Sequence, residues 1–313
     1  MKLSGKIFLI IIITICLYAI FLIFSDISQV LDKLSNFNLK YLPLILIIIP
    51  ASWFVLFARW HYLLKNAGVQ VPMKQNLKIY FAGFALAVTP GKFGELIKSQ
   101  LMKKQFGIPR TTTAPLVLVE RLYDLVGGVA VAIIGILSLG LGMYVIIGAT
   151  IILVVIFLLL RSKKLFDTFL KLFSKTKITC KLVEPISQSY DSVQKSTRGK
   201  IVIVSSLLSM CYWAIESIGV YLIVISFGID KLSYYTVMST YASSLILGAA
   251  SFIPGGIGIT EGSMTGLFIF HGIEISSVFT LVIIIRLFTM WYSVIIGFIS
   301  LKLSGGFSMF RNS

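Results

Sequence analysis

A few charged side chains lie inside long apolar stretches of the sequence, and these are the residues that could do chemistry. Arg121 follows an apolar run and lies beside Glu120 and Asp124, whereas Arg286 stands alone among aliphatic residues. An ionisable side chain within a membrane span costs about 2.5–3.5 kcal/mol on insertion scales, so such a residue faces the protein interior and has a partner or a task. Because a guanidinium group pairs equally well with phosphate and carboxylate, the two arginines predict a site for an anionic group.

Carboxylates in similar settings offer the arginines a second kind of partner. Glu95 and Glu261 each follow a glycine-rich break, and Glu216 is isolated among apolar residues. The arginines either bind an anionic headgroup directly, or they pair with one of these carboxylates until substrate displaces it. The structural alternative is a set of permanent ion pairs that fixes helix register. Glu120 and Asp124 share one helical face at i, i+4, and for Glu120 this alternative is at least as good.

Two glycine-broken segments, 88–95 and 252–261, interrupt apolar sequence at corresponding places and share the pattern Pro-Gly-x-x-Gly. Irregular backbone at membrane depth is tolerated only where protein covers it or a watery cavity lies beside it. A pair of such breaks is typical of the substrate site of transporters built from inverted repeats. The residues expected at the tips of these breaks are Pro90, Gly91, Gly94, Pro254, Gly255, Gly256 and Gly258.

A helix that begins just after either Pro-Gly pair would point free backbone N–H groups and its positive dipole end into the membrane, which creates an anion site. Lys92 and Lys98 would strengthen the first of these sites, or else extend to the lipid headgroups. Gly94 and Gly258 either serve the site or only allow close helix packing. The candidate translocation residues are therefore Arg121, Arg286, Glu95, Glu261, Glu216, Glu120, Asp124, Lys92 and Lys98.

The sequence lacks the motifs that are typical of enzymes, metal sites and cofactor sites. The two histidines, His61 and His271, have no HExxH or similar partner, and the cysteines are widely spaced. The sequence contains no Walker motif, no Gly-x-Ser-x-Gly and no Asp-x-Asp that would bind the metal of a nucleotide sugar. We therefore predict no catalytic residue, no metal and no cofactor, and a protein that is not an enzyme.

Composition places these residues in a membrane protein. The chain has 313 residues, of which 57% are hydrophobic and 13% charged, and its mean hydropathy is +0.96. These values lie far outside the range of soluble domains. We predict an all-α integral membrane protein with about six spanning helices and two broken segments. The expected spans are 7–24, 43–64, 114–138, 142–160, 201–226 and 275–300, with broken segments near 77–104 and 236–272.

The net charge of +16 follows the loops, which argues against a nucleic-acid partner. With a cytoplasmic N-terminus, most of the 28 basic residues fall on the cytoplasmic side, including those between Arg59 and Arg110 and between Arg161 and Lys200. This predicts a multi-pass cell-membrane protein with both termini cytoplasmic. Each broken segment is then a re-entrant hairpin that enters and leaves by the same face, although a full crossing out and back gives the second the same topology.

The two halves of the chain repeat each other. Gly107-Ile108 precedes Arg121 as Gly272-Ile273 precedes Arg286, with an offset of 165 residues, and the Pro-Gly motifs are offset by 164. Each unit is one span, one broken segment and one span, and the topology makes the units antiparallel, with their tips meeting near the midplane. The predicted single domain divides into 1–42, repeat 1 at 43–139, a connecting helix and basic cytoplasmic loop at 140–200, repeat 2 at 201–303 and a tail at 304–313.

The motifs Thr89-Pro90-Gly91-Lys92-Phe93-Gly94-Glu95, Glu120-Arg121-Leu122-Tyr123-Asp124 and Pro254-Gly255-Gly256-Ile257-Gly258-Ile259-Thr260-Glu261-Gly262 occur in this order. Together they resemble the lysylphosphatidylglycerol synthase transmembrane, flippase-like family over about residues 5–303. In the synthase members of that family the membrane part moves an aminoacylated phospholipid between leaflets, and a C-terminal cytosolic domain attaches the amino acid. That domain is not expected here, so the resemblance implies translocation without synthesis.

Three functions follow as hypotheses. The first is a flippase-like transporter for an anionic or aminoacylated phospholipid or a polyprenyl-phosphate-linked lipid. The second is a membrane-embedded lipid or polyprenyl-phosphate transferase, with Glu95 or Glu261 as nucleophile or base; the absence of Asp-x-Asp argues against the sugar-transferase label that some stand-alone relatives carry. The third is a membrane partner of a separate lipid-modifying enzyme. Membrane lipids are the expected partners, and the sequence specifies no oligomeric state.

Overall fold

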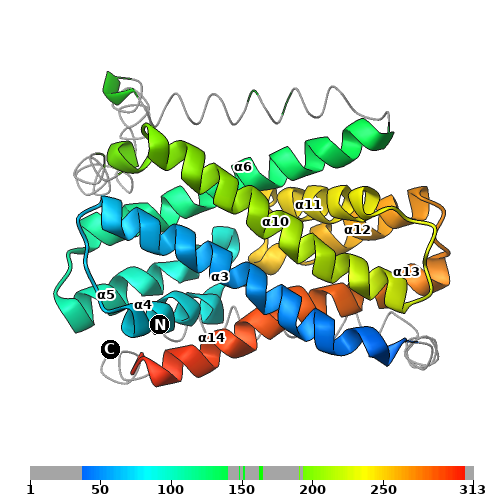
Figure 1. The fold of residues 1–313 in the computed structure, drawn as a ribbon, viewed down its shortest axis with the longest axis horizontal. Coiled ribbons are helices and arrows are strands. Elements are labelled where there is room, and N and C mark those ends of the chain that lie inside the picture. The colour runs from blue at the N-terminus through cyan, green and yellow to red at the C-terminus, as the bar shows by residue number, and fades with distance from the viewer. Residues whose placement is uncertain are drawn as a thin grey trace.

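The computed structural model describes residues 37–139 and 193–306, together with 148, 151, 162–164 and 190. Across these residues the regular structure is helical, without strands, which confirms the all-α class (Figure 1). The expected span 7–24 and nearly all of 142–160 lie outside the described residues.

Three described helical segments are long and apolar enough to cross a membrane, and they match three of the expected spans. The apolar composition of each segment favours burial in lipid or protein over water. A further helix, α6, covers the expected span at 114–138 but carries four charged residues in its first half, Arg110, Glu120, Arg121 and Asp124. The three segments are Leu39–Asn66, formed by η1 (Leu39–Tyr41) and α3 (Leu42–Asn66); Lys200–Ser226, which is α10; and Ser277–Leu303, which comprises most of α13 (Ile275–Arg286), the π-helical turn η5 (Leu287–Trp291) and α14 (Tyr292–Leu303).

Each broken segment is a pair of helices joined through short 3₁₀ turns. The following helix begins at Ile97 in the first segment and at Ile259 in the second, so neither begins directly after its Pro-Gly pair as expected. The elements of the first segment are α4 (Met73–Ala82), η2 (Gly83–Leu86), η3 (Pro90–Leu96) and α5 (Ile97–Phe106), which leads to α6 (Arg110–Leu139); those of the second are α11 (Tyr234–Ala250), η4 (Pro254–Gly256) and α12 (Ile259–Phe270).

The backbone explains this difference. The residue before each proline is extended, as the proline ring requires, and the glycine after it is left-handed, with φ of 57° at Gly91 and 63° at Gly255. A left-handed residue cannot belong to a right-handed α-helix, and glycine adopts this conformation without steric cost. The helix therefore begins only after the turn. We call η3 the first tip and η4 the second tip.

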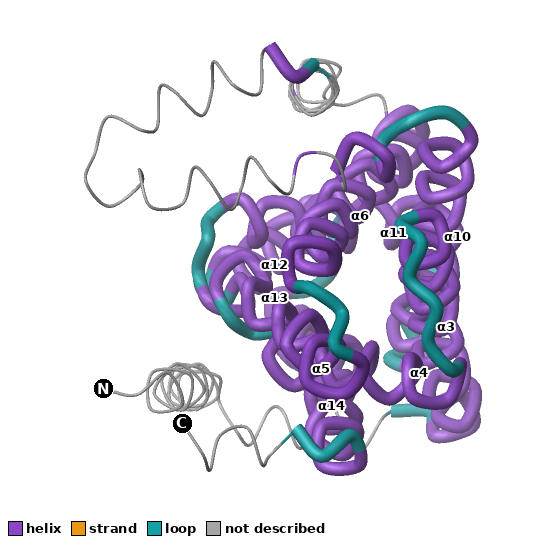
Figure 2. Tube along the Cα trace, turned by 90° about the vertical axis from the view of Figure 1, so that its left-hand side faces the viewer, coloured by secondary structure: helices purple, strands orange, loops and turns teal. Residues whose placement is uncertain are grey.

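The helices pack in reciprocal pairs. The first helices of the two halves, α3 and α10, lie side by side (Figures 1 and 2). The last helix of the first half, α6, packs on α11 of the second half, and the last helix of the second half, α14, packs on α4 and η2 of the first. The first tip contacts the second tip. These contacts bring the two Pro-Gly breaks together in space although they are far apart in the sequence.

Glycines allow close approach at two helix contacts, that of α14 with η2 and that of α6 with α10. A Cβ atom on Gly297 of α14 would lie 2.8 Å from the Cα atom of Ala85 in η2, and one on Gly127 of α6 would lie 2.7 Å from the Cβ atom of Ser209 in α10. Real Cβ contacts are longer, so a larger residue would push the helices apart. The second contact fixes α6 against α10, where the charged residues of α6 lie.

Candidate functional site

Arg121 binds carboxylates on both sides. Its Nη2 atom lies 3.2 Å from Oε2 of Glu95 in the first tip, and its Nη1 atom lies 2.9 Å from Oδ2 of Asp124 one turn along α6. The sequence offered Glu95 as an alternative partner for this arginine, and the structure contains that pair. Arg121 and Asp124 nevertheless keep 19% and 16% of their side-chain surface exposed, so the pair is accessible.

Lys98 lies inside the protein. Its Nζ atom donates to Glu95 at 3.0 Å and to Glu120 at 2.6 Å, and it lies over the rings of Trp60 and Tyr80 at 4.8 and 4.7 Å from their centroids. The side chain is completely buried, so it does not extend to the lipid headgroups. Its two carboxylates and two aromatic faces satisfy the ammonium group and fix the start of α5 against α6.

Arg59 is a member of this site that the sequence analysis counted only among the basic residues of the cytoplasmic side and did not include among the site residues. Arg59 lies within α3 and is fully buried. Its Nη2 atom lies 2.7 Å from Oδ1 of Asp124 and 3.8 Å from Oε1 of Glu120, and its Nη1 atom donates to Ser209 at 2.5 Å. A signal existed in the sequence, because Glu120 and Asp124 share a helical face that requires more positive charge than Arg121 alone supplies.

These residues form a group that is neutral overall. Three cations face three carboxylates, and each makes at least one ion pair within the described residues. Such a group is stable when it is complete and costly when one member is removed, because the partner is left as an uncompensated buried charge. We call it the charge cluster; its members are Arg59, Glu95, Lys98, Glu120, Arg121 and Asp124.

The second half contains a simpler counterpart. The Nε atom of Arg286 donates to Oε1 of Glu261 at 2.7 Å, and its Nη2 atom donates to the carbonyl of Gly255 in the second tip at 2.5 Å. The other Glu261 oxygen accepts from the N–H of Gly258 at 2.7 Å, so it caps the start of α12. Glu261 therefore occupies the position that the sequence analysis assigned to a bound anion, and the π-helical turn η5 begins directly after Arg286.

The two ion pairs occupy corresponding places in the two halves, with an offset of 166 residues between the glutamates and 165 between the arginines. Glu95 pairs with Arg121 in the first half, and Glu261 pairs with Arg286 in the second. In both cases a carboxylate, within the first tip or just beyond the second, binds the arginine of a later helix. Each pair therefore closes its own tip, and the two tips in turn contact each other.

Lys92 differs from every other candidate. Its backbone is left-handed, with φ of 56°, and it corresponds in the repeat to Gly256, with φ of 66°. Its side chain is exposed by surface area although protein atoms surround it densely. A lysine in a conformation that favours glycine costs energy, and such strain is concentrated at functional sites. Among the described residues Lys92 forms no ion pair or hydrogen bond through its side chain.

Gly94 has a packing role, and Gly258 has a conformational one. A Cβ atom on Gly94 would lie 2.5 Å from the carbonyl oxygen of Leu86, and its N–H donates to Thr89 at 2.6 Å. Gly258 has φ of 85° and open space around its Cα atom. Close packing is thus a structural role of the first glycine, whereas the second allows the turn that precedes α12.

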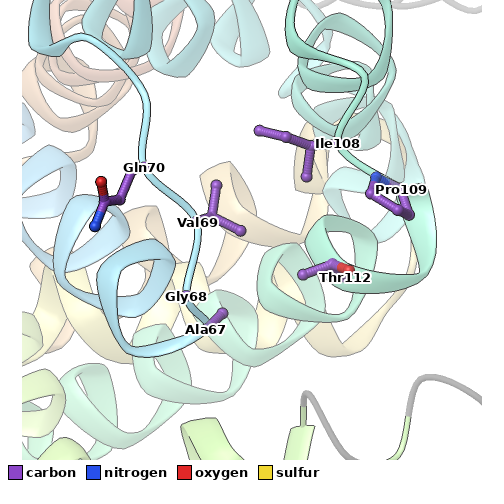
Figure 3. Close-up of a pocket in the computed structure, with 7 residues that line it drawn as sticks. All are labelled: Ala67, Gly68, Val69, Gln70, Ile108, Pro109 and Thr112. Carbon is purple, nitrogen blue, oxygen red and sulfur yellow. The ribbon is translucent and has the colours of Figure 1, made fainter.

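Within the described residues, no group of three histidine, cysteine or acidic side chains could hold a metal ion. A pocket of about 530 Å³ lies between the turn after α3 and the start of α6 (Figure 3). Its lining carries no charged side chain, so it does not provide a site for an anion. The lining residues are Ala67, Gly68, Val69, Gln70, Ile108, Pro109 and Thr112.

Comparison with known proteins gives a consistent result. Residues 8–297 match the family model described as the lysylphosphatidylglycerol synthase TM region. A UPF0104 membrane protein of Pyrococcus horikoshii is 24% identical, over 93% of this chain and 95% of its own. Another, of Methanocaldococcus jannaschii, is 27% identical, over 68% of this chain and 91% of its own. A third, of Methanothermobacter thermautotrophicus, is 23% identical over 76% of both chains.

Proposed function

This chain is a membrane protein that belongs to the lysylphosphatidylglycerol synthase TM region family, and on that premise we propose that it moves an anionic lipid between the leaflets of the membrane. The phosphate of the lipid binds beside Lys92 at the junction of the two tips, while its acyl or prenyl chains stay in the surrounding lipid. The protein itself performs no covalent chemistry on the lipid.

One observation carries this proposal: within the described residues, Lys92 is an accessible cation whose side chain makes no hydrogen bond or ion pair, next to a cluster whose cations all make one. A phosphate that reaches this lysine gains a charge-assisted hydrogen bond without first breaking an ion pair. The left-handed backbone at Lys92 holds its side chain at the junction in spite of the strain. Arg121, which is partly exposed, is the next donor available to the headgroup.

The reciprocal packing supports an inverted repeat. In a two-fold arrangement, a contact is either between an element and its own counterpart, or it is repeated between the counterparts of the two elements. Here α3 packs on its counterpart α10, the tips pack on each other, and the contact of α6 with α11 is matched by that of α14 with α4. We infer that repeat 1 and repeat 2 are related by a pseudo-twofold axis in the membrane plane, with the broken segments as re-entrant hairpins.

This symmetry supplies a mechanism for alternating access. If the two units exchange their conformations, a site at the tip junction opens first to one leaflet and then to the other without moving itself. The pairs Glu95–Arg121 and Glu261–Arg286 bind each tip to its own unit, so that tip and helix move as one body. A permanent pair is suited to this task, and this favours positioning as the role of both arginines.

The same pairs count against a transferase. Glu95 and Glu261 were the carboxylates proposed as nucleophile or base, and each already accepts hydrogen bonds from an arginine. A carboxylate bound in this way is a weak base, because its cation stabilises the charged form. We propose instead that any chemical modification of the lipid is performed by a separate enzyme.

The test is reconstitution into liposomes that contain a fluorescent phosphatidylglycerol, with a membrane-impermeant quencher to report the outer leaflet. We expect the wild-type protein to accelerate the movement of the labelled lipid between leaflets, Lys92→Ala to abolish that acceleration, and Lys92→Arg to restore most of it. Lys302→Ala, which changes an exposed lysine in the last turn of α14, is the matched control and should move lipid at the wild-type rate. Equal rates in wild-type and empty liposomes would refute the function.

A further inference from the structure

Glu216 is a buried acid that the proposed mechanism does not yet use. It lies in α10 with only 2% of its surface exposed, and it takes part in none of the ion pairs among the described residues. One of its carboxylate oxygens is buried and accepts no hydrogen bond. An ionised carboxylate in such a place is costly, and a proton removes most of that cost.

The groups around Glu216 come from every element packed against this part of α10. Most of these groups are polar but uncharged; the one cation among the immediate neighbours is Lys92, and Arg286 is already paired with Glu261. The immediate neighbours are Trp53 of α3, Tyr212 of α10, Tyr241 of α11 and Lys92 of the first tip; beyond them, Tyr212 interacts with Asp124 of α6, and Tyr241 with Arg286 of α13.

Lys92 is the one cation in this set that is not paired with a carboxylate of the charge cluster or the Glu261–Arg286 pair. Its charge interacts with Arg121, Glu95 and Asp124 of the charge cluster and also with Glu216. A phosphate that binds beside Lys92 therefore brings a second negative charge close to Glu216. Because one cation in a poorly solvated site does not compensate two anions, occupation by phosphate opposes ionisation of Glu216.

We propose that Glu216 takes up one proton when an anionic headgroup binds beside Lys92, so that lipid movement is coupled to proton movement in the same direction. This inference rests on the proposed function and adds its coupling ion. The proton passes from the aqueous phase to the carboxylate oxygen that accepts no hydrogen bond. It returns to water on the other side after the headgroup has left and no phosphate lies beside Lys92.

Thermodynamic linkage makes this coupling measurable as binding, without transport. The experiment is titration calorimetry of purified protein in mild detergent with a short-chain phosphatidylglycerol, repeated in buffers that differ in ionisation enthalpy. The phosphodiester of this lipid does not titrate near neutral pH, so any proton taken up on binding comes to the protein. The dependence of the binding enthalpy on buffer enthalpy gives the number of protons.

We expect wild-type protein to take up about one proton per lipid bound, and its affinity to fall about tenfold for each pH unit above the range in which Glu216 titrates. Glu216→Gln, which mimics the protonated acid, should bind at all pH values with the highest wild-type affinity and take up no proton. Glu216→Asp should retain proton uptake. Glu274→Gln, at an exposed acid that makes no cap bond at the start of α13, is the matched control and should behave as wild type.

The outcomes separate the two proposals. If the wild-type protein binds phosphatidylglycerol without taking up a proton, the role of Glu216 is overturned and the transport function still stands. This outcome is measured on the wild type and does not depend on the folding of any variant. Proton uptake that persists in Glu216→Gln would also overturn it. If wild-type protein binds no phosphatidylglycerol and does not move it in liposomes, the function itself fails.

Discussion

Arg59 donates to Asp124 over 2.7 Å, and this contact joins the long helix before the first break to the long helix after it. Both side chains are anchored further, Arg59 by Ser209 of α10 and Asp124 by Arg121. Three helices that are distant in the sequence are therefore connected through one guanidinium group. Glu95 of the first tip binds Arg121, and Arg121 binds the same Asp124 that Arg59 contacts. The position of Lys92 in the first tip therefore depends indirectly on Arg59.

The first prediction is that Arg59→Met destabilises the fold strongly. The substitution keeps most of the apolar contacts of the side chain but leaves Glu120 and Asp124 with one cation fewer. Removing one partner of a buried pair typically costs about 3–5 kcal/mol. The measurement is thermal unfolding in detergent, with Lys302→Met as the exposed control. An unchanged unfolding midpoint for Arg59→Met would contradict a buried position of Arg59.

The second prediction concerns the pair Glu261–Arg286. Each of Glu261→Gln and Arg286→Met alone should destabilise the protein by about 3–5 kcal/mol, because each leaves a buried charge without its partner. The double variant buries no charge, so it should lose much less than the sum of the single losses. Unfolding free energies of the four proteins form a double-mutant cycle. Additive losses would mean that the two groups do not interact.

The third prediction separates strain from function at Lys92. Lys92→Gly should raise the free energy of unfolding by about 0.5 kcal/mol, since the gain from relieving a left-handed side chain exceeds the extra entropy of glycine in the unfolded chain. The same variant should lose lipid movement because the ammonium group is gone. Gly256→Ala, at the equivalent position of the second tip, should instead destabilise. A Lys92→Gly protein that is less stable than wild type would show that the side chain has a structural partner.

Much of this arrangement could be predicted from the sequence, because the features repeat. The Pro-Gly motifs located both tips, and the equal spacing from Gly107-Ile108 to Arg121 and from Gly272-Ile273 to Arg286 marked the arginines that bind them. The pairing of these arginines with Glu95 and Glu261 remained one of two alternatives, since a guanidinium group suits carboxylate and phosphate equally. Only the distances in the structure select the carboxylates.

Two features were not predicted in this way. Arg59 lies near the end of an apolar stretch, where a positive charge has the same pattern as an ordinary cytoplasmic flank. Its burial depends on carboxylates from α6, and that contact is tertiary. The left-handed backbone at Lys92 has no local signal either, because lysine carries no preference for it; only alignment with Gly256 in the other repeat indicates it.

The last prediction tests the contact between α14 and η2, which supports the proposed two-fold packing. Gly297→Ala would place a Cβ atom 2.8 Å from the Cα atom of Ala85, a backbone atom that cannot move without displacing the first broken segment. The variant should therefore lower the unfolding midpoint and slow lipid movement together. Gly266→Ala in α12 is the matched control, because a Cβ atom there meets open space. That substitution should be neutral or stabilise by up to about 1 kcal/mol, as alanine is the better helix former. Equal behaviour of the two variants would contradict the close approach of α14 to η2, and with it the symmetry that the alternating-access mechanism requires.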